Sequence, residues 1–258
     1  MKKMKKRMAV AVVLLSTILA VWQMAEAHFG MIIPSDEMVE KGDRPIVDLQ
    51  LRFWHPFEGQ GMELLRPAEF GVVANGIRRD LLEKLTAKKI KGHTTWEASY
   101  RVKRPGLYVF YMVPQPYLEK AENSYIIHYT KTVMAAYGED MGWDKPIGLK
   151  TEIVPLSRPF GLYAGNVFQG VVMLNGKPVP NCMVEVEYFN EESKYSAPTD
   201  YMVTQTIKAD TNGVFTCGVP MAGWWGFAAL STDEHQIEGR DVEIGAVLWV
   251  NFQQMKSP

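Results

Sequence analysis

The feature that most constrains the fold is an alternation of apolar and polar residues with a period of two. It is clearest in residues 46–53, where Val47, Leu49, Leu51 and Phe53 alternate with Asp48, Gln50 and Arg52. A strand that packs one face on a core buries every second side chain, so the pattern predicts β-structure. Residues 95–103 alternate in the same way, and residues 107–113 are mostly apolar. Since Pro105-Gly106 favours a turn, we expect these two segments to form a hairpin.

The second half of the chain repeats this strand pattern. Six strands are expected at 166–174, 179–188, 202–209, 213–219, 226–230 and 243–252. Asn175-Gly176 predicts a tight hairpin turn, because both residues tolerate positive φ. This spacing is typical of an immunoglobulin-like or prealbumin-like sandwich. Pro155 to Gly165 interrupts the pattern and predicts a domain boundary.

We therefore expect an all-β protein with two β-sandwich domains, an N-terminal one at 28–157 and a C-terminal one at 158–258. The lysine-rich segment 79–91 is compatible with a short helix or an irregular strand. Segment 125–136 is compatible with a strand or a helix.

The N-terminus has the layout of a secretory signal peptide. Five cations in the first seven residues precede an apolar run that ends near Trp22, and Ala25-Glu26-Ala27 has the small-x-small form of a cleavage site. The apolar run, about 15 residues, is shorter than the roughly 20 that a membrane-spanning helix needs. We expect a signal peptide at 1–27, cleavage after Ala27 and a periplasmic or secreted protein. A retained N-terminal anchor is the alternative.

Cleavage would change the net charge of the chain. Residues 1–27 carry five cations and one anion, so the charge of −1 becomes −5 in the mature protein. A mildly acidic chain without a basic stripe argues against nucleic-acid binding. Cys182 and Cys217 lie on expected strands, and in an oxidising compartment they could form one disulfide or stay as buried thiols.

Histidines are the candidate metal ligands. After cleavage His28 would carry a free α-amine and an imidazole, a pair that can chelate a transition metal. His55 follows an expected strand and precedes Pro56, so Glu58 would lie on the same turn as a ligand or a ligand's partner. His128 lies in an apolar and aromatic stretch where a buried imidazole needs a partner. His235 lies in a polar loop.

No local motif ties these residues together. HxH and HExxH spacings are absent from the sequence, as are a Gly-rich phosphate loop and a G-x-S-x-G nucleophile motif. His93, at an expected turn, is the weakest ligand candidate. Gly223-Trp224-Trp225-Gly226-Phe227 favours sandwich core over a carbohydrate-stacking surface.

Several segments resemble a known family. The signal peptide, the His28 to Asp36 stretch, the Trp54 to Glu58 turn, Ile126 to Lys131 and Arg158 to Asn166 are similar to exported proteins described as periplasmic components of cobalt or nickel transport systems. The likeness spans nearly all of the mature chain. Gly176 to Pro180 and Asp210 to Phe215 also resemble carboxypeptidase-regulatory and collagen-binding-B sandwiches.

The resemblance implies a metal-binding protein outside the inner membrane that supplies a membrane permease complex. It implies His28, His55 and His128 as ligands, with Glu58 and His235 as further candidates, and Ni²⁺ or Co²⁺ as the ion; Cu²⁺ or Zn²⁺ also suit such ligands. No catalysis is expected. Two alternatives stay open: a copper oxidase with an N-terminal histidine brace, and a structural, adhesive or glycan-binding sandwich without metal.

Overall fold

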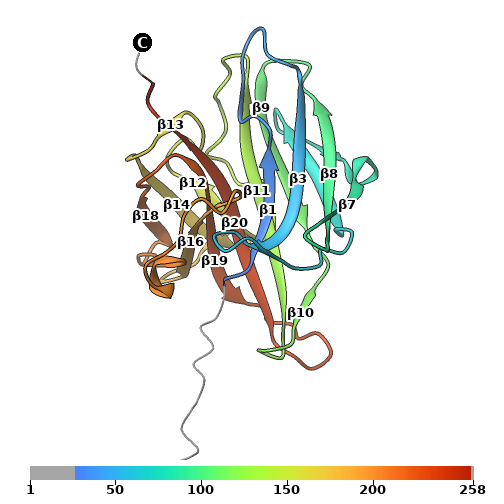
Figure 1. Cartoon of the computed structure of the whole chain (residues 1–258), viewed down its shortest axis with the longest axis vertical. Helices are drawn as coiled ribbons and strands as arrows, with labels where there is room; N and C mark the ends of the chain where they lie inside the picture. The colour runs from blue at the N-terminus through green and yellow to red at the C-terminus, as the bar shows by residue number, and fades with distance from the viewer. Residues whose placement is uncertain (1–26, 257–258) are drawn as a thin grey trace, which may run out of the picture.

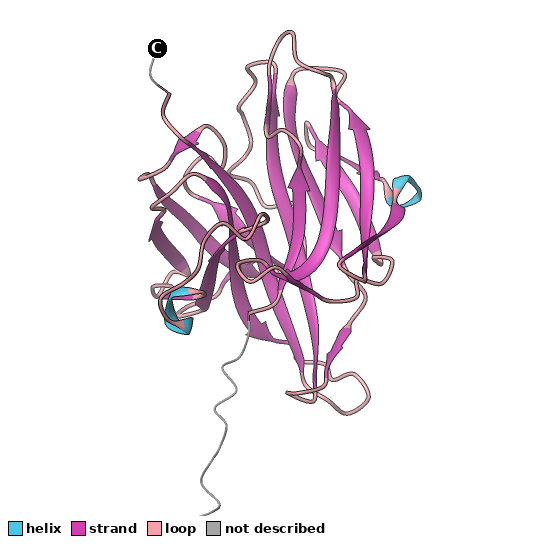
Figure 2. Cartoon of the chain, in the orientation of Figure 1, coloured by secondary structure: helices cyan, strands magenta, loops and turns pink. Residues whose placement is uncertain are grey.

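The computed structural model describes residues 27–256, so the expected signal peptide, apart from Ala27, lies outside the described residues. Within them the chain forms twenty strands and two short 3₁₀ helices, η1 (Leu82–Lys84) and η2 (Asp200–Met202) (Figure 2). The expected all-β class is confirmed. No helix in the described part is long and apolar enough to cross a membrane.

The strands form three sheets. The first sheet is antiparallel and follows the order β1 (Phe29–Pro34), β3 (Ile46–His55), β8 (His93–Arg101), β7 (Thr86–Ile90), with the short β4 (Gln60–Gly61) paired to β3. The third sheet has the order β12 (Thr151–Pro155), β14 (Val167–Leu174), β15 (Lys177–Pro178), with β18 (Val214–Gly218) paired to β14.

The second sheet is the largest and lies between the other two (Figure 1). Its order is β17 (Gln205–Lys208), β16 (Met183–Tyr188), β19 (Gly223–Thr232), β20 (Val242–Gln253), β11 (Ser124–Ala136), β9 (Gly106–Val113), β5 (Glu69–Ala74), β6 (Ile77–Asp80). The short strands β10 (Tyr117–Glu119) and β2 (Met38–Val39) pair with β11, and β13 (Leu162–Tyr163) pairs with β20.

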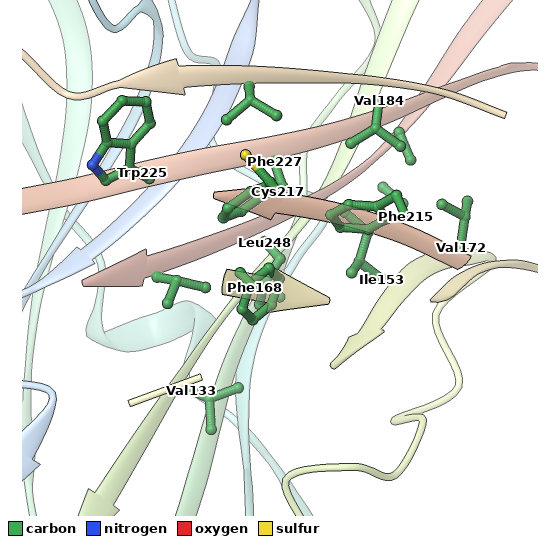
Figure 3. Packing of buried hydrophobic residues seen from close by; sticks show 14 of the residues in the cluster. Val133, Ile153, Phe168, Val172, Val184, Phe215, Cys217, Trp225, Phe227 and Leu248 are labelled. Carbon is green, nitrogen blue, oxygen red and sulfur yellow. The ribbon is translucent and has the colours of Figure 1, made fainter. Parts of the chain in front are cut away.

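The described residues form three hydrophobic clusters, and the two largest lie on opposite faces of the second sheet. One joins the first sheet to β5, β9 and β11 and contains Leu49, Leu51, Phe70 and Phe110. The other joins the third sheet to β16, β19 and β20; Figure 3 shows Phe168, Phe215 and Phe227 packed together within it. Burial of these apolar side chains is the main stabilising contribution to each sandwich.

Strand pairs cross the expected domain boundary at 157/158. β11 pairs in parallel with β20 from Tyr125↔Val242 to Thr132↔Trp249, and β12 pairs with β14. The two expected halves are therefore joined through both the second and the third sheet. The division into two domains at 28–157 and 158–258 stays a prediction.

The predicted hairpin of 95–103 with 107–113 is wrong. Both segments are strands, but β8 pairs with β3 and β7, whereas β9 pairs with β11 and β5. The chain crosses at Pro105-Gly106 from one sheet to the other. The physical reason is burial: nearly every side chain of β9 is buried, which places it in the central sheet, while β8 is only half-buried.

The structure shows which conformation the two ambiguous segments adopt and how the turn, cysteine and tryptophan predictions compare with it. Segment 125–136 is strand β11, and 79–91 holds the end of β6, η1 and β7. Asn175 and Gly176 both have positive φ and connect β14 to β15, as predicted. Cys182 and Cys217 are buried free thiols, with no disulfide between them. Trp225 is buried in the core, as the core interpretation expects.

Candidate metal centre

Strand register brings His28 and His55 together. β1 and β3 are antiparallel, with Phe29 opposite Trp54 and Gly30 opposite Phe53. The same register places His28, one residue before β1, opposite His55, the last residue of β3. The centroids of the two imidazole rings are 4.6 Å apart. Residues opposite one another on antiparallel strands have neighbouring Cβ atoms, so this meeting follows directly from the strand pairing.

A chain of ring contacts extends from this pair. The His28 ring stacks on Phe53, with centroids 5.5 Å apart, and Phe53 in turn meets His128 edge-on at 5.8 Å. Tyr117 contacts both His28 and Phe53. His28, His55 and His128, the strongest ligand candidates from the sequence, therefore lie in one aromatic cluster. Its members come from β3, β10, β11 and the residue before β1.

His28 is held as a neutral imidazole. Its side chain is 12% exposed, and its Nε2 lies 3.1 Å from a carboxylate oxygen of Glu119. Burial lowers its pKa from 6.5 to about 4, with further lowering by the neighbouring His55 and His128, against the opposing effect of the carboxylates. A neutral ring at pH 7 carries one N–H. The carboxylate beside Nε2 favours the tautomer with the hydrogen on Nε2, which leaves the lone pair on Nδ1.

His128 lies deeper, and both of its ring nitrogens have partners. The Gly30 backbone N–H donates to Nδ1 at 3.4 Å, and Nε2 lies 3.3 Å from a carboxylate oxygen of Glu243. The ring lies against Gly245, its partner in the parallel β11–β20 pairing, where a Cβ atom would overlap the imidazole. His128 thus fastens the start of β1 to the central sheet.

The turn after His55 is anchored by the C-terminal half of the chain. The Phe57 backbone N–H donates to Glu187 at 3.2 Å, and the Asn190 side-chain amide donates to the Phe57 carbonyl at 3.1 Å. The Asn190 backbone N–H donates to the Pro56 carbonyl. These contacts fix the position of His55 and Glu58 at the junction between the two expected domains.

His28, His55 and Glu58 line a cleft of about 860 Å³. Carboxylates dominate its ionisable lining residues: besides Glu58 they are Glu119, Glu122, Glu185, Glu187 and Asp200. Burial raises the pKa of Glu187 to about 8 and that of Glu185 to about 7, so these two are largely or partly protonated at neutral pH. A cleft of this composition attracts cations.

Two sequence candidates lie away from the cluster. His235 follows β19 in the loop before β20, and its side chain is 78% exposed beside Asp233 and Glu234. It is not among the residues that line the cleft. His93, the weakest candidate, begins β8 and does not line the cleft. Its ring lies near the position that a Cβ atom on Gly61 would occupy.

Apart from Glu58, the carboxylates of this site were not predicted from the sequence. Glu119 lies in a three-residue strand, which is too short for an alternating pattern to predict. Glu243 lies near the start of β20, just before an apolar run. Glu185 and Glu187 alternate with the buried Val184 and Val186, which reads as an ordinary half-exposed strand. In the structure the face that carries the two glutamates is largely covered as well.

Among residues 27–256, no group of three or more His, Cys, Asp or Glu side chains is arranged to hold a metal ion. The described site is thus a pair of facing imidazoles, His28 and His55, in an acidic cleft. His128, which contacts Glu243, holds the adjoining strand β1 in place.

Fold and site together define an all-β sandwich protein with a histidine- and carboxylate-lined cleft at the junction of its sheets. The chain belongs to the family described as "Domain of unknown function (DUF4198)", whose profile matches residues 25–233. A search of the curated proteins found no match.

Several solved structures align with most of the chain at low sequence identity. The D0-D1 domain of intimin aligns with a TM-score of 0.24 and 11% identity, covering 88% of this chain and 100% of that one. The Yersinia pseudotuberculosis adhesin InvE aligns with a TM-score of 0.26 and 9% identity, covering 85% and 58%. The fibronectin(III)-like modules of Clostridium thermocellum CbhA align with a TM-score of 0.23 and 8% identity, covering 88% and 98%.

Proposed function

We propose that this protein binds a transition-metal ion, Ni²⁺ or Co²⁺, outside the inner membrane and passes it to a membrane permease complex. The observation that carries the proposal is the pair of facing imidazoles, His28 and His55, 4.6 Å apart between ring centroids in an acidic cleft. The ion is the cargo of the protein, and no catalytic step is part of the proposal.

The donor set suits such an ion. Imidazole nitrogens are ligands for nickel, copper, cobalt and zinc, and a ligand must be deprotonated to bind. The lowered pKa of His28, about 4, supplies a neutral ring at pH 7. The surrounding carboxylates offset the charge of a cation and raise its local concentration. The resemblance to exported cobalt and nickel transport components supports the same class of ligand.

The direct test is metal titration of exported protein whose first residue has been identified by mass spectrometry. Calorimetry with Ni²⁺, Co²⁺, Cu²⁺ and Zn²⁺ should give one site per chain, with Cu²⁺ bound most tightly because of its position in the Irving–Williams series. At a free-metal concentration of 100 times Kd, binding to the native state should add about 2.7 kcal/mol of stability. His28→Ala and His55→Ala should each weaken binding.

His235→Ala is the matched control, because it removes an imidazole that lies outside the cleft. Equal affinities for His28→Ala, His55→Ala and His235→Ala would reject the proposal. Absence of any binding by the exported protein would also reject it and would favour a metal-free structural or adhesive sandwich, with which the fold is compatible. Peroxide production from ascorbate by the copper-loaded protein, above that of free copper, would instead favour the oxidase alternative.

A further inference from the structure

The proposed function does not say which atoms hold the ion. The polar contacts of His28 and His128 show which of their imidazole nitrogens can bind it. If the chain begins at His28, that residue offers an α-amine, Nδ1 and Nε2. Only Nδ1 is close enough along the covalent skeleton to close a six-membered chelate ring with the α-amine, because Cα, Cβ and Cγ alone separate the two nitrogens. Nε2 is one ring atom further away and faces Glu119.

Glu119 selects the chelating nitrogen. Its carboxylate lies 3.1 Å from Nε2 of His28, and both side chains are largely buried. Glu119 is the last residue of β10 and pairs with Ser124 of β11, so its position is fixed by the central sheet. A carboxylate that accepts the N–H of a ligand histidine orients the ring and raises its basicity. The carboxylate therefore favours the hydrogen on Nε2 and leaves Nδ1 as the nitrogen with a lone pair for an ion.

His128 has no nitrogen left for an ion while its observed contacts hold. Its Nδ1 accepts from the Gly30 backbone N–H, which requires Nε2 to carry the ring hydrogen that faces Glu243. The side chain is fully buried. His128 thus fixes β1, and through β1 the position of His28, without contacting the cleft.

We propose that the ion is held by three nitrogens, the α-amine and Nδ1 of His28 and one imidazole nitrogen of His55, and that Glu119 and His128 are positioning residues. This inference rests on the proposed function. It uses only two side chains, which is compatible with the absence of a three-side-chain site among residues 27–256. Nitrogen donors in a tetragonal arrangement suit Ni²⁺ better than Co²⁺, so the cargo narrows to Ni²⁺. They suit Cu²⁺ as well, which makes Cu²⁺ the spectroscopic probe of the site.

The α-amine is tested by comparing two chains. One begins at His28, and the other begins at Gln23 and so retains five residues ahead of His28. Electron paramagnetic resonance of the Cu²⁺-loaded proteins should show coupling to three nitrogens in the first chain and fewer in the second. The affinity for Cu²⁺ and Ni²⁺ should fall about 100-fold or more in the extended chain, while its far-UV circular dichroism stays unchanged.

Glu119 is tested by a pair of substitutions. Glu119→Leu removes the acceptor of the Nε2 hydrogen and should weaken metal binding about 10- to 100-fold, the range for lost partners of ligand histidines. Glu119→Gln keeps an acceptor oxygen and should restore most of the affinity and the three-nitrogen spectrum. A purely structural role for Glu119 would change the melting temperature and leave the spectrum as it was.

The outcomes separate this inference from the proposed function. Tight binding that is the same in both chains would overturn the three-nitrogen site and leave metal binding standing. Loss of one nitrogen coupling in His128→Gln, in a variant that keeps its melting temperature, would also overturn it, since His128 would then be a ligand. Failure of both chains to bind any of the ions would reject the proposed function and the inference together.

Discussion

Glu187 should make the stability of this protein depend on pH. The side chain is buried on β16, at 1% exposure, and accepts hydrogen bonds from the Thr204 hydroxyl and the Phe57 backbone N–H. Burial raises its pKa from 4.5 to about 8, and these two hydrogen bonds offset only part of that effect. The folded protein therefore binds a proton at Glu187 that the unfolded chain releases near pH 4.5.

The sign of the effect follows from this difference in proton binding. Since the folded state holds the extra proton, its stability falls as the pH rises from about 4.5 to about 8. The contribution is fully present below pH 4.5 and is lost above pH 8. At roughly 1.4 kcal/mol per tenfold change in proton affinity, the upper bound is about 5 kcal/mol, and relaxation of the site will reduce it to a few kcal/mol.

Urea denaturation of metal-free protein at pH 5, 7 and 9 measures this contribution. We expect the wild-type free energy of unfolding to fall over this range, and Glu187→Gln, which cannot lose a proton, to remove a large part of the fall. Glu185, whose pKa burial raises to about 7, contributes to the fall that remains. Glu234→Gln, an exposed position next to His235, is the control and should behave like the wild type. If Glu187→Gln and wild type keep the same difference in stability from pH 5 to pH 9, Glu187 does not titrate as argued.

Two further predictions concern the packing that supports the site. Gly245→Ala should destabilise the protein by about 1–3 kcal/mol, because the added methyl group meets the His128 ring, whereas Gly218→Ala, with open space around its Cβ position, should be tolerated; equal melting temperatures would contradict this. Lys131→Met should cost about 3–5 kcal/mol in chemical denaturation, because it leaves the Glu152 carboxylate buried without its ammonium partner. The double variant with Glu152→Gln should recover a large part of that loss, and no recovery would show that the ion pair is not the cause.

Much of the secondary structure could be read from local pattern. The alternation around Leu49 identified β3, and Asn175-Gly176 identified a hairpin turn, because both signals are carried by neighbouring residues. The connection at Pro105-Gly106 could not be read, because a turn between two strands looks the same whether the strands pair or enter different sheets. Only the competition for burial between sheets settles that choice.

The candidate site shows the same division. His28, His55 and His128 could be proposed because histidine is scarce and each has a distinctive neighbourhood. Glu119, Glu187 and their partners could not, since glutamate is common on exposed strands.

The sequence by itself determined that this chain is built from strands and where most of them lie. It also determined which histidines are candidate metal ligands. These properties depend on residues that are close in the chain. Tertiary structure decided that His28 faces His55 and that the Glu119 carboxylate lies beside Nε2 of His28. It also decided that Nδ1 of His128 accepts a hydrogen bond from the backbone of β1. Those facts depend on strand register and on sheet order, which are fixed by the burial of whole faces against one another and not by any short stretch of sequence.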